Sequence, residues 1–390
     1  MRASNWLLPE FISDILPAEA RALEELRRKL LDLYQHNGFE LVAPPLVEFT
    51  ESLFAGQRAD LPKKTAKVID QLSGRTMGIR PDITPQVTRI DAHLLNRQGV
   101  TRLCYCGVVF HALPNDLIGD RELVQIGAEI FGYAGMEADL QIISLAYQTL
   151  DMAGVHSAKL DLNHPGIMRA LVATHPVLEA EVDKLNALVR EKAITSLKAF
   201  LAELDGVSTE IQEALLVLPN LYGGIDTLDR ARSVLPKLPE IEMALDELDM
   251  VAKRFPSVSV DLADVSGYDY HTGISFALYA EGWHNALVRG GRYDKVAKAY
   301  GRERPATGFS LNLRRLVQGL ASPEPAEAIK TIWSDDPAQL AEILQLREKG
   351  HIVVQLFPNT EQVNEEFVFT RELVLENNQW LLKSIGSSVN

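Results

Sequence analysis

The sequence predicts an α+β protein, because strand-like and helix-like segments follow one another in blocks along its 390 residues. Strand-like segments gather before residue 164 and return between residues 258 and 289, whereas residues 165–255 are almost entirely helical in pattern. A short tail mixes both patterns. We therefore expect a core made of residues 1–164 and 256–321, a helical insertion at 165–255 and a small α/β domain at 326–390.

The first elements are a helix and a strand that prolines interrupt. Leucines between residues 23 and 33 recur at helical spacing, and Gly38 is placed to end this helix. The segment 39–47 is predicted to be a strand, although Pro44 and Pro45 lie within it. Proline has no N–H group to donate to a sheet, so this strand should lie at an edge or at a subunit boundary.

The rest of the core alternates between strands and helices. Residues 76–80 predict a strand that leads into a helix at 82–95, whose first turn contains a proline. Residues 102–110 and 122–133 predict a pair of strands around a loop. After them we expect a helix ending at Ala153, strands at 159–162, 258–262, 273–279 and 285–289, and a helix at 311–320.

Leucines at helical spacing fill the insertion, and prolines and Gly223–Gly224 separate its helices. The segment 322–325 (SPEP) has the composition of a linker. Beyond it the pattern predicts one helix and four strands, at 330–333, 351–357, 366–370 and 380–383.

Composition and charge narrow the possible roles. The net charge is 39 − 53 = −14, which argues against a nucleic-acid surface as the main function, because such surfaces neutralise phosphates with Lys and Arg. No apolar run approaches the roughly 20 residues of a membrane span, and the first residues lack a signal-peptide core, so we expect a cytoplasmic protein. Cys104 and Cys106 are expected to be buried, reduced thiols, with no metal site.

Several motifs occur in one order along the chain. They are FISDILPAEA and APPLVE near the start, IRPDIT at 79–84, the segment 102–132, SGYDYHTGISF at 266–276, RGGRYD at 289–294 and TGFSLNLRRL at 307–316. Together they resemble the histidyl-tRNA synthetase family over roughly residues 8–320, including the position of the helical insertion. The resemblance implies a class II aminoacyl-tRNA synthetase-like fold: a mixed, mostly antiparallel sheet flanked by helices, dimeric through its N-terminal segment.

The residues that would bind ATP in this family differ in the present sequence. Histidine activation brings a carboxylate to the α-phosphate of ATP, so cations must stabilise the charge that develops there. By the resemblance, His111 and Ser266 stand where the family has arginines, and Leu113 where it has an acidic residue that helps to hold adenine. An imidazole and a hydroxyl cannot reproduce a bidentate guanidinium. Arg121 and Arg315 still match family arginines and are candidate phosphate contacts.

The residues that would bind the amino acid match the family pattern more closely. An α-ammonium group needs acceptors, and an imidazole needs polar partners in a closely fitting pocket. The resemblance implies that Asp82, Thr84 and Gln125 face the ammonium and carboxylate groups, and that Glu129 faces the imidazole. Tyr270 fits the signature, whereas His271 stands where the family usually has a second tyrosine.

Each of these residues also has a simpler interpretation. Asp82 would be a favourable charge at a helix N-terminus, and Glu129 a surface residue of a strand. Arg292 and Asp294 would be turn residues required by the glycines before them. His111 would be an exposed loop histidine with no role of its own.

Beyond residue 320 the resemblance to the synthetases ends, and no domain for reading a tRNA anticodon is recognisable. The chain thus combines a phosphate site that lacks two arginines with a retained amino-acid pocket. In this it resembles the ATP phosphoribosyltransferase regulatory subunit family, which consists of synthetase-like proteins of bacterial histidine biosynthesis. That resemblance implies no catalytic residue, no cofactor, no activity of the chain alone and no tRNA binding. It implies a short-form catalytic subunit as partner, histidine as effector, and a dimer within a hetero-oligomer, a hetero-octamer. A divergent histidyl-tRNA synthetase and a scaffold that binds no small molecule are the alternatives.

Overall fold

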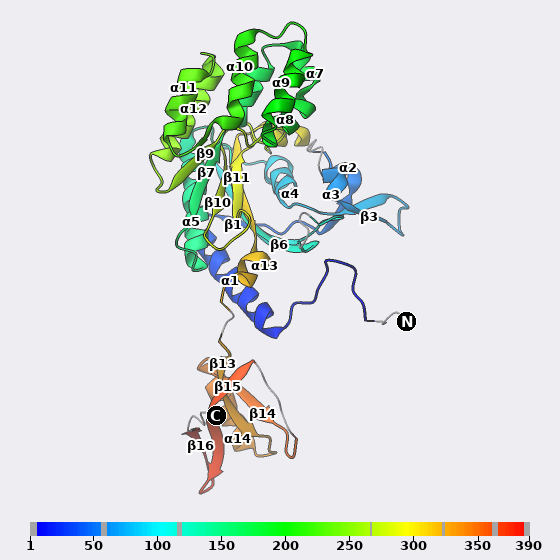
Figure 1. Cartoon of the computed structure of the whole chain (residues 1–390). Helices are drawn as coiled ribbons and strands as arrows, with labels where there is room; N and C mark the ends of the chain where they lie inside the picture. The colour runs from blue at the N-terminus through cyan, green and yellow to red at the C-terminus, as the bar shows by residue number, and fades with distance from the viewer. Residues whose placement is uncertain are drawn as a thin grey trace, which may run out of the picture. The chain divides into compact units, whose positions relative to one another are not determined.

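The computed structural model describes residues 6–55, 61–114, 119–265, 267–321, 324–360 and 366–385. The chain divides into two compact units. The larger unit consists of Met1–Asp14 and Leu23–Leu320, and the smaller one of Ile15–Ala22 and Ala321–Asn390. Among the described residues, the larger unit contains two sheets and the smaller unit one (Figure 1).

Within the described residues, nine strands of the larger unit form one sheet in the order β1-β5-β6-β12-β11-β10-β7-β9-β8 (Figure 1). Neighbouring strands are antiparallel except for β1 with β5 and β7 with β9, so the predicted mixed, mostly antiparallel sheet is confirmed. The strands are β1 (Glu40–Leu41), β5 (Thr101–Phe110), β6 (Glu122–Phe131), β7 (Lys159–Asn163), β8 (Tyr222–Gly223), β9 (Val258–Asp261), β10 (Ser275–Tyr279), β11 (Val288–Arg292) and β12 (Ala306–Asn312).

The β5–β6 hairpin and β12 lie side by side in this sheet. β5 and β6 pair over their whole length, and β12 pairs with β6 from Ala306 to Asn312. β12 was not predicted from the sequence, although residues 309–312 alternate between apolar and polar side chains, and a helix was expected from residue 311 instead. The predicted helix at 311–320 was wrong at its start: α13 (Leu313–Gln318) begins only after this strand.

The predicted strand at 39–47 was wrong as a single strand. The prolines separate β1, at the edge of the large sheet, from β2 (Val47–Phe49), which belongs to another sheet. This second sheet is antiparallel, in the order β2-β4-β3, with β3 at Ala66–Ile69 and β4 at Thr76–Ile79. The break follows from chemistry, because Pro44 and Pro45 have no N–H group to continue a ladder.

Two long helices pack against one face of the large sheet, and the cavity described below opens on the other face. α1 (Pro17–His36) and α5 (Met136–Met152) lie together, since Thr149 Oγ1 donates to Tyr34 OH at 3.2 Å. The Tyr34 ring packs edge-on against Phe309 of β12 at 6.0 Å. Side chains alternate along a strand, so Ser310 faces the opposite side of the sheet from Phe309. The site described below lies on the side of Ser310.

The remaining helices of the core are short. α4 (Thr84–Arg89) has Pro85 in its first turn, as predicted, but continues as a π-helix, η1 (Ile90–Leu95), rather than as a uniform α-helix. Ile83 and Val87 pack on Leu103 and Tyr105 of β5 and place the turn before α4 against the sheet. The others are α2 (Thr50–Leu53), α3 (Leu61–Lys64) and the 3-10 helix η3 (Val296–Tyr300).

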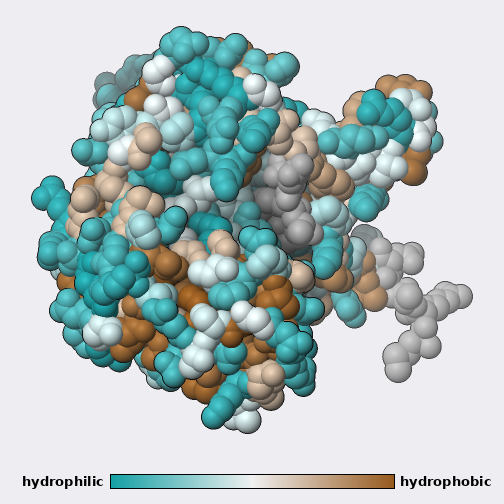
Figure 2. Space-filling model, turned by 90° about the horizontal axis from the view of Figure 1, so that it is seen from above, coloured by the Kyte–Doolittle hydropathy of each residue, from teal (hydrophilic) through white to brown (hydrophobic). Residues whose placement is uncertain are grey.

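Between β7 and β9 the chain is mainly helical. In addition, the two-residue strand β8 pairs with β9, so this segment contributes to the large sheet. The surface seen from the side of these helices is largely hydrophilic, with hydrophobic residues in small groups (Figure 2). The helices are α6 (Pro165–Val172), α7 (Pro176–Ala180), α8 (Val182–Arg190), α9 (Ile194–Ala202), α10 (Thr209–Val217), η2 (Leu218–Asn220), α11 (Asp226–Val234) and α12 (Pro239–Ala252).

The smaller unit contains a four-stranded sheet in the order β14-β13-β15-β16. β13 (Ala326–Ile332) pairs in parallel with β14 (Ile352–Leu356) and β15 (Phe367–Glu376), and β16 (Gln379–Ser384) is antiparallel to β15. α14 (Pro337–Glu348) places Ile343 and Leu346 in a core with Ile329. Trp380 closes this core, and its indole N–H donates to Asp336 at 2.7 Å.

Every helix among the described residues is too short or too polar to cross a lipid bilayer. Cys104 is buried, Cys106 is half-buried, and neither is in a disulfide. Burial raises the pKa of Cys104 to about 12 and that of Cys106 to about 11, so both thiols stay protonated at neutral pH.

Candidate functional site

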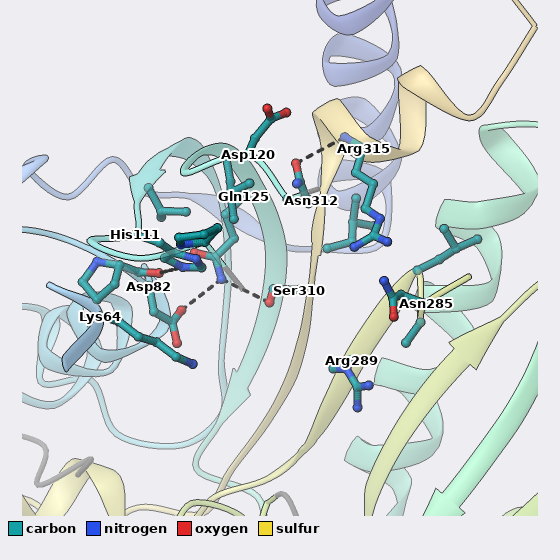
Figure 3. A pocket seen from close by; sticks show the side chains of 18 of the residues that line it. Lys64, Asp82, His111, Asp120, Gln125, Asn285, Arg289, Ser310, Asn312 and Arg315 are labelled. Atoms are coloured by element: carbon teal, nitrogen blue, oxygen red, sulfur yellow. Dashed lines mark hydrogen bonds between the residues drawn. The ribbon is translucent and has the colours of Figure 1, made fainter. Parts of the chain in front are cut away.

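A large cavity of about 1140 Å³ opens on the face of the sheet opposite α1 and α5, and its lining comes from segments far apart in the sequence (Figure 3). The turn before α4, the ends of β5 and β6, and strands β11 and β12 all contribute, and α13 lies at one end. Its polar and charged lining residues include Lys64, Asp82, His111, Asp120, Gln125, His284, Asn285, Arg289, Ser310, Asn312, Arg315 and Gln318.

Asp82 and Gln125 are held together in the wall of this cavity. Gln125 Nε2 donates to Asp82 Oδ1 at 2.9 Å and to Ser310 Oγ at 3.1 Å, while its Oε1 accepts from the Ile83 N–H at 2.8 Å. Asp82 Oδ1 also accepts from the Thr84 N–H at 3.0 Å. The Asp82 carboxylate therefore accepts from the first residue of α4, in line with the simpler interpretation of a charge near a helix N-terminus, and it also faces the cavity. A fixed carboxylate in such a wall can accept hydrogen bonds from an ammonium group.

Glu129 lies in a buried cluster of hydroxyl groups rather than in the lining of the cavity. It is 1% exposed, so the surface interpretation of this residue was wrong. Its Oε1 accepts from Tyr105 OH at 3.0 Å and from Thr84 Oγ1 at 3.3 Å, and its Oε2 accepts from Tyr293 OH at 2.6 Å. Burial raises the pKa of Glu129 to about 8, although the three hydroxyl groups act in the opposite direction.

The signature residues Tyr270 and His271 pack edge-on against each other, with ring centroids 5.2 Å apart. The Tyr270 ring stacks on Tyr293 with centroids 5.0 Å apart. His271 lines a second, smaller cavity of about 260 Å³, together with Asp161 and Asp264. The structure thus brings Asp82 and Gln125 into one cavity and His271 into another. Arg289 lines both.

His111 is not an exposed loop residue, so that interpretation was wrong. It is 7% exposed and its backbone N–H donates to the Arg121 carbonyl at 2.8 Å. Its Nε2 lies 3.0 Å from the carbonyl oxygen of Pro81. Because a carbonyl only accepts, Nε2 carries the proton of this hydrogen bond. His111 therefore holds the peptide that precedes Asp82.

The other residues of the predicted ATP half are dispersed. Leu113 is 70% exposed and lines neither cavity, and Ser266 lies outside the described residues. The guanidinium of Arg121 stacks on Phe110 at 4.8 Å and donates to the His111 carbonyl at 3.1 Å, so it stiffens the hairpin and does not line the cavity. Arg315 lines the cavity from α13, whose first turn is capped by Asn312 (Figure 3).

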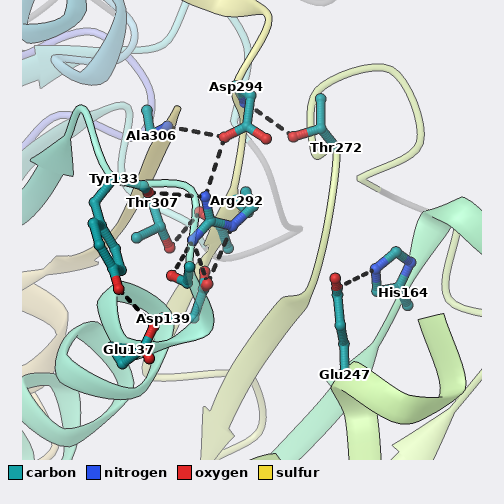
Figure 4. A network of polar contacts seen from close by, with 12 residues as sticks. Tyr133, Glu137, Asp139, His164, Glu247, Thr272, Arg292, Asp294, Ala306 and Thr307 are labelled. Carbon is teal, nitrogen blue, oxygen red and sulfur yellow. Dashed lines mark hydrogen bonds and ion pairs between the residues drawn. The ribbon is translucent and has the colours of Figure 1, made fainter. Parts of the chain in front are cut away.

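Arg292 has a larger structural role than that of a turn residue (Figure 4). It is 6% exposed and donates to Asp139 Oδ2 of α5 from Nε at 3.1 Å and from Nη2 at 2.5 Å. It also donates to the carbonyl oxygens of Tyr133 and Gly135, and its Nη1 lies 3.4 Å from Asp294. Arg292 therefore fixes β11 against α5.

Sequence reasoning missed Ser310 and Arg289. Both lie within the motifs TGFSLNLRRL and RGGRYD, but no feature of the sequence distinguished the Ser310 hydroxyl or the first arginine of RGGRYD as part of the site. They become part of the site because β11 and β12 pair, with Arg289 directly opposite Ser310. Chemically, the site combines a carboxylate, amide and hydroxyl groups with separate guanidinium groups, a set suited to binding a small polar molecule with both charges. Among the described residues, no three His, Cys, Asp or Glu side chains gather as a metal ion requires.

The chain is similar to known proteins over nearly its whole length. Residues 11–316 match a model of the family described as histidyl-tRNA synthetase, and residues 326–383 match one described as the ATP phosphoribosyltransferase subunit HisZ C-terminal domain. The similar solved structures include an ATP phosphoribosyltransferase regulatory subunit/histidyl-tRNA synthetase from Bacillus halodurans. Its TM-score is 0.81 at 25% identity, over 94% of this chain and 97% of that chain. A histidyl-tRNA synthetase from Nostoc shares the fold, with a TM-score of 0.75 at 18% identity over 95% and 92% of the two chains.

Two relatives named ATP phosphoribosyltransferase regulatory subunit are similar over their full length. The one from Bordetella petrii is 55% identical over 383 residues, which is 98% of this chain and 100% of the relative. The one from Ralstonia pickettii is 49% identical over 389 residues, or 99% and 100% of the two chains. With the synthetase-like core and the matching C-terminal domain, the chain belongs to the ATP phosphoribosyltransferase regulatory subunit family.

Proposed function

We propose that this chain has no catalytic activity of its own, activates a short-form ATP phosphoribosyltransferase catalytic subunit, and makes that subunit sensitive to histidine. The observation that carries the proposal is the full-length similarity to proteins named as regulatory subunits, at 55% identity in one case. In this function the chain works in the cytoplasm as a dimer joined through its N-terminal segment, within a hetero-octamer that binds no tRNA.

The arrangement of the ATP half supports the absence of adenylate chemistry. Activation of a carboxylate by ATP needs cations that point at the α-phosphate. The His111 ring instead donates to the Pro81 carbonyl, and Arg121 lies over Phe110. Arg315 remains in the cavity wall as one candidate phosphate contact. Of the two arginines that match family positions, Arg315 lines the cavity and Arg121 does not, and one such arginine does not reproduce the set of cations that the reaction requires.

The acceptor groups of the other half support histidine as the ligand. Asp82 and Gln125 would receive the α-ammonium group, with Thr84 fixing the Asp82 carboxylate through its N–H. Glu129, Tyr270 and His271 would face the imidazole, which needs polar partners on both ring nitrogens. In the present conformation Glu129 is enclosed by hydroxyl groups, so the proposal requires Tyr270 or the turn before α4 to shift when histidine enters.

Regulation then follows from differential binding. Histidine changes the activity of the complex only if it binds the inhibited and the active assemblies with different affinity. A coupling of 1–3 kcal/mol, or roughly 5- to 150-fold in affinity, is typical for such effectors. The turn that carries Asp82 is a suitable transmitter, because it connects β4 to α4 beside the cavity. Within it, the Arg80 guanidinium donates to the Pro44 carbonyl and to the Val108 carbonyl of β5.

Four measurements test this function together. The purified chain should catalyse no histidine-dependent exchange of pyrophosphate into ATP, and its addition to a short-form phosphoribosyltransferase should raise the turnover of that enzyme. Histidine should then inhibit the mixture, and it should also bind to the isolated chain in the absence of the enzyme. Absence of activation by the purified chain would refute the regulatory proposal.

A divergent histidyl-tRNA synthetase is the second candidate, and the match of residues 11–316 to the synthetase family favours it. The cavity is also several times larger than a free histidine requires, which leaves space for a nucleotide. Robust pyrophosphate exchange would establish this alternative. A scaffold that binds no small molecule would show neither exchange nor heat of histidine binding in calorimetry.

A further inference from the structure

Arg289 is a cation in the site that has no partner in the described part of the chain. It is the second residue of β11, it is exposed, and it makes no hydrogen bond or ion pair with another described residue. The other Lys and Arg residues that line the large cavity, Lys64 and Arg315, each already interact with another residue. Arg289 is therefore the guanidinium in this wall whose donors are open to a ligand.

The pairing of the strands sets the position of Arg289 relative to the acceptor side of the site. Arg289 lies directly opposite Ser310 on β12, and Ser310 accepts the hydrogen bond from Gln125, which in turn donates to Asp82. Residues directly opposite each other in an antiparallel pair project from the same face of the sheet. Figure 3 shows this arrangement, with Ser310 between Gln125 and Arg289.

The spacing across the sheet fits a small molecule that carries both charges. β6 and β11 lie two strand spacings apart, about 9.6 Å. A molecule between them would make charge-assisted hydrogen bonds of about 2.8 Å at each end. An α-amino acid has its ammonium and carboxylate groups on one carbon, so it can reach Asp82 on one side and Arg289 on the other. On the far side of Arg289, Ala277 of β10 is its other cross-strand neighbour and leaves the guanidinium room to move.

We propose that Arg289 binds the α-carboxylate of the amino acid held in this cavity, while Asp82 receives the α-ammonium group. This inference rests on the proposed function, in which the ligand is histidine. A guanidinium presents two parallel N–H donors that match the two oxygens of a carboxylate, which a lysine cannot do. Arg289 also borders the small cavity that contains His271, so a ligand anchored on it reaches both parts of the predicted site.

The test compares L-histidine with L-histidinol, in which a hydroxymethyl group replaces the carboxylate, by isothermal titration calorimetry on the full chain. The unaltered chain should bind histidine more tightly than histidinol. Arg289→Gln should weaken histidine binding by about 10- to 100-fold, the range expected for a lost charged hydrogen-bond pair. Histidinol binding should change less than about twofold, because histidinol has no carboxylate to accept hydrogen bonds from the guanidinium.

Matched variants separate the possible results. Arg315→Gln removes the other arginine of the cavity wall and should leave the preference for histidine over histidinol intact. Equal weakening of both ligands by Arg289→Gln, or loss of the preference in Arg315→Gln instead, would overturn the assignment of Arg289. If the unaltered chain bound neither ligand, the proposed histidine sensing itself would fail. Because Arg289 is exposed and unpaired among the described residues, Arg289→Gln should keep the thermal midpoint of the parent chain.

Discussion

The hydroxyl of Tyr293 donates a 2.6 Å hydrogen bond to Oε2 of Glu129, and both side chains are at most 2% exposed. The bond joins the residue that follows β11 to the last part of β6, across the intervening strand β12. Burial is the main cause that raises the pKa of Glu129 to about 8. At neutral pH this carboxyl group is therefore mostly protonated in the folded chain.

The first prediction concerns the pH dependence of stability. The folded chain binds a proton at Glu129 that the unfolded chain releases above its ordinary pKa of 4.5. The contribution of Glu129 to the free energy of unfolding is therefore complete below about pH 4.5. It is lost as pH rises to about 8, by up to about 1.4 kcal/mol per pH unit. Glu129→Gln has no proton to lose, so its free energy of unfolding should fall less over this range. Urea denaturation of both chains from pH 5 to 8.5 measures the difference, and parallel curves would contradict the assigned pKa.

The second prediction concerns Gly308, which lies opposite Glu129 on β12. A Cβ atom at position 308 would overlap Glu129 Oε2 and would lie 2.7 Å from the Ala128 carbonyl oxygen. Gly308→Ala should therefore reduce the free energy of unfolding by about 1–3 kcal/mol, the usual cost of overpacking. Adding Glu129→Ala removes one of the two overlaps, so the double variant should be more stable than the sum of the single effects predicts.

A neighbouring glycine supplies the control for that cycle. A Cβ atom on Gly127 would lie 2.5 Å from Tyr105 OH and from the Phe309 carbonyl oxygen, and Glu129 is not among its nearest atoms. Gly127→Ala should destabilise the chain by a similar amount, and Glu129→Ala should relieve it less than it relieves Gly308→Ala, because the overlap with the Phe309 carbonyl oxygen remains. Equal rescue of both glycine variants would show that the effect of Glu129→Ala is unspecific.

The third prediction compares how replacing each of two arginines in β11 changes the stability of the chain. Arg292 and Asp139 form a buried ion pair, with side chains 7% and 3% exposed. Arg292→Met leaves the Asp139 carboxylate buried without its partner and should cost about 3–5 kcal/mol of stability. Arg289→Met, three residues earlier and exposed, should change stability by less than about 0.5 kcal/mol. Chemical denaturation of both variants makes the comparison, and equal costs would show that burial of the pair is not the cause.

The fourth prediction tests the acceptor for the ammonium group. Asp82→Asn keeps the shape of the side chain but removes its charge, so histidine binding should weaken at least tenfold, as expected for a lost charge-assisted hydrogen bond. Asp120→Asn is the matched control, because Asp120 lines the same cavity but lies within 3.8 Å of Arg314. Titration calorimetry with histidine measures both, and a larger effect of Asp120→Asn would place the ammonium group elsewhere.

Much of the candidate site was readable from the sequence because the motifs are local. Asp82 and Thr84 lie within one six-residue motif, and Gln125 and Glu129 lie four residues apart on one strand. Their side chains therefore had to project from the same face of β6. By contrast, nothing local distinguishes Glu129, which is enclosed by hydroxyl groups of Tyr105 and Tyr293, from a strand residue facing water.

The sequence by itself determined the succession of strands and helices, the position of the helical segment after β7, and the loss of arginines at positions 111 and 266. These features depend on periodicity and on residue identity, which are local properties. Only the tertiary structure decided that β12 is a strand between β6 and β11, that His111 is buried against Pro81, and that Arg289 lies across Ser310 from Gln125 and Asp82. The physical reason is that pairing between distant strands fixes which side chains share a face, and no spacing along the chain contains that information.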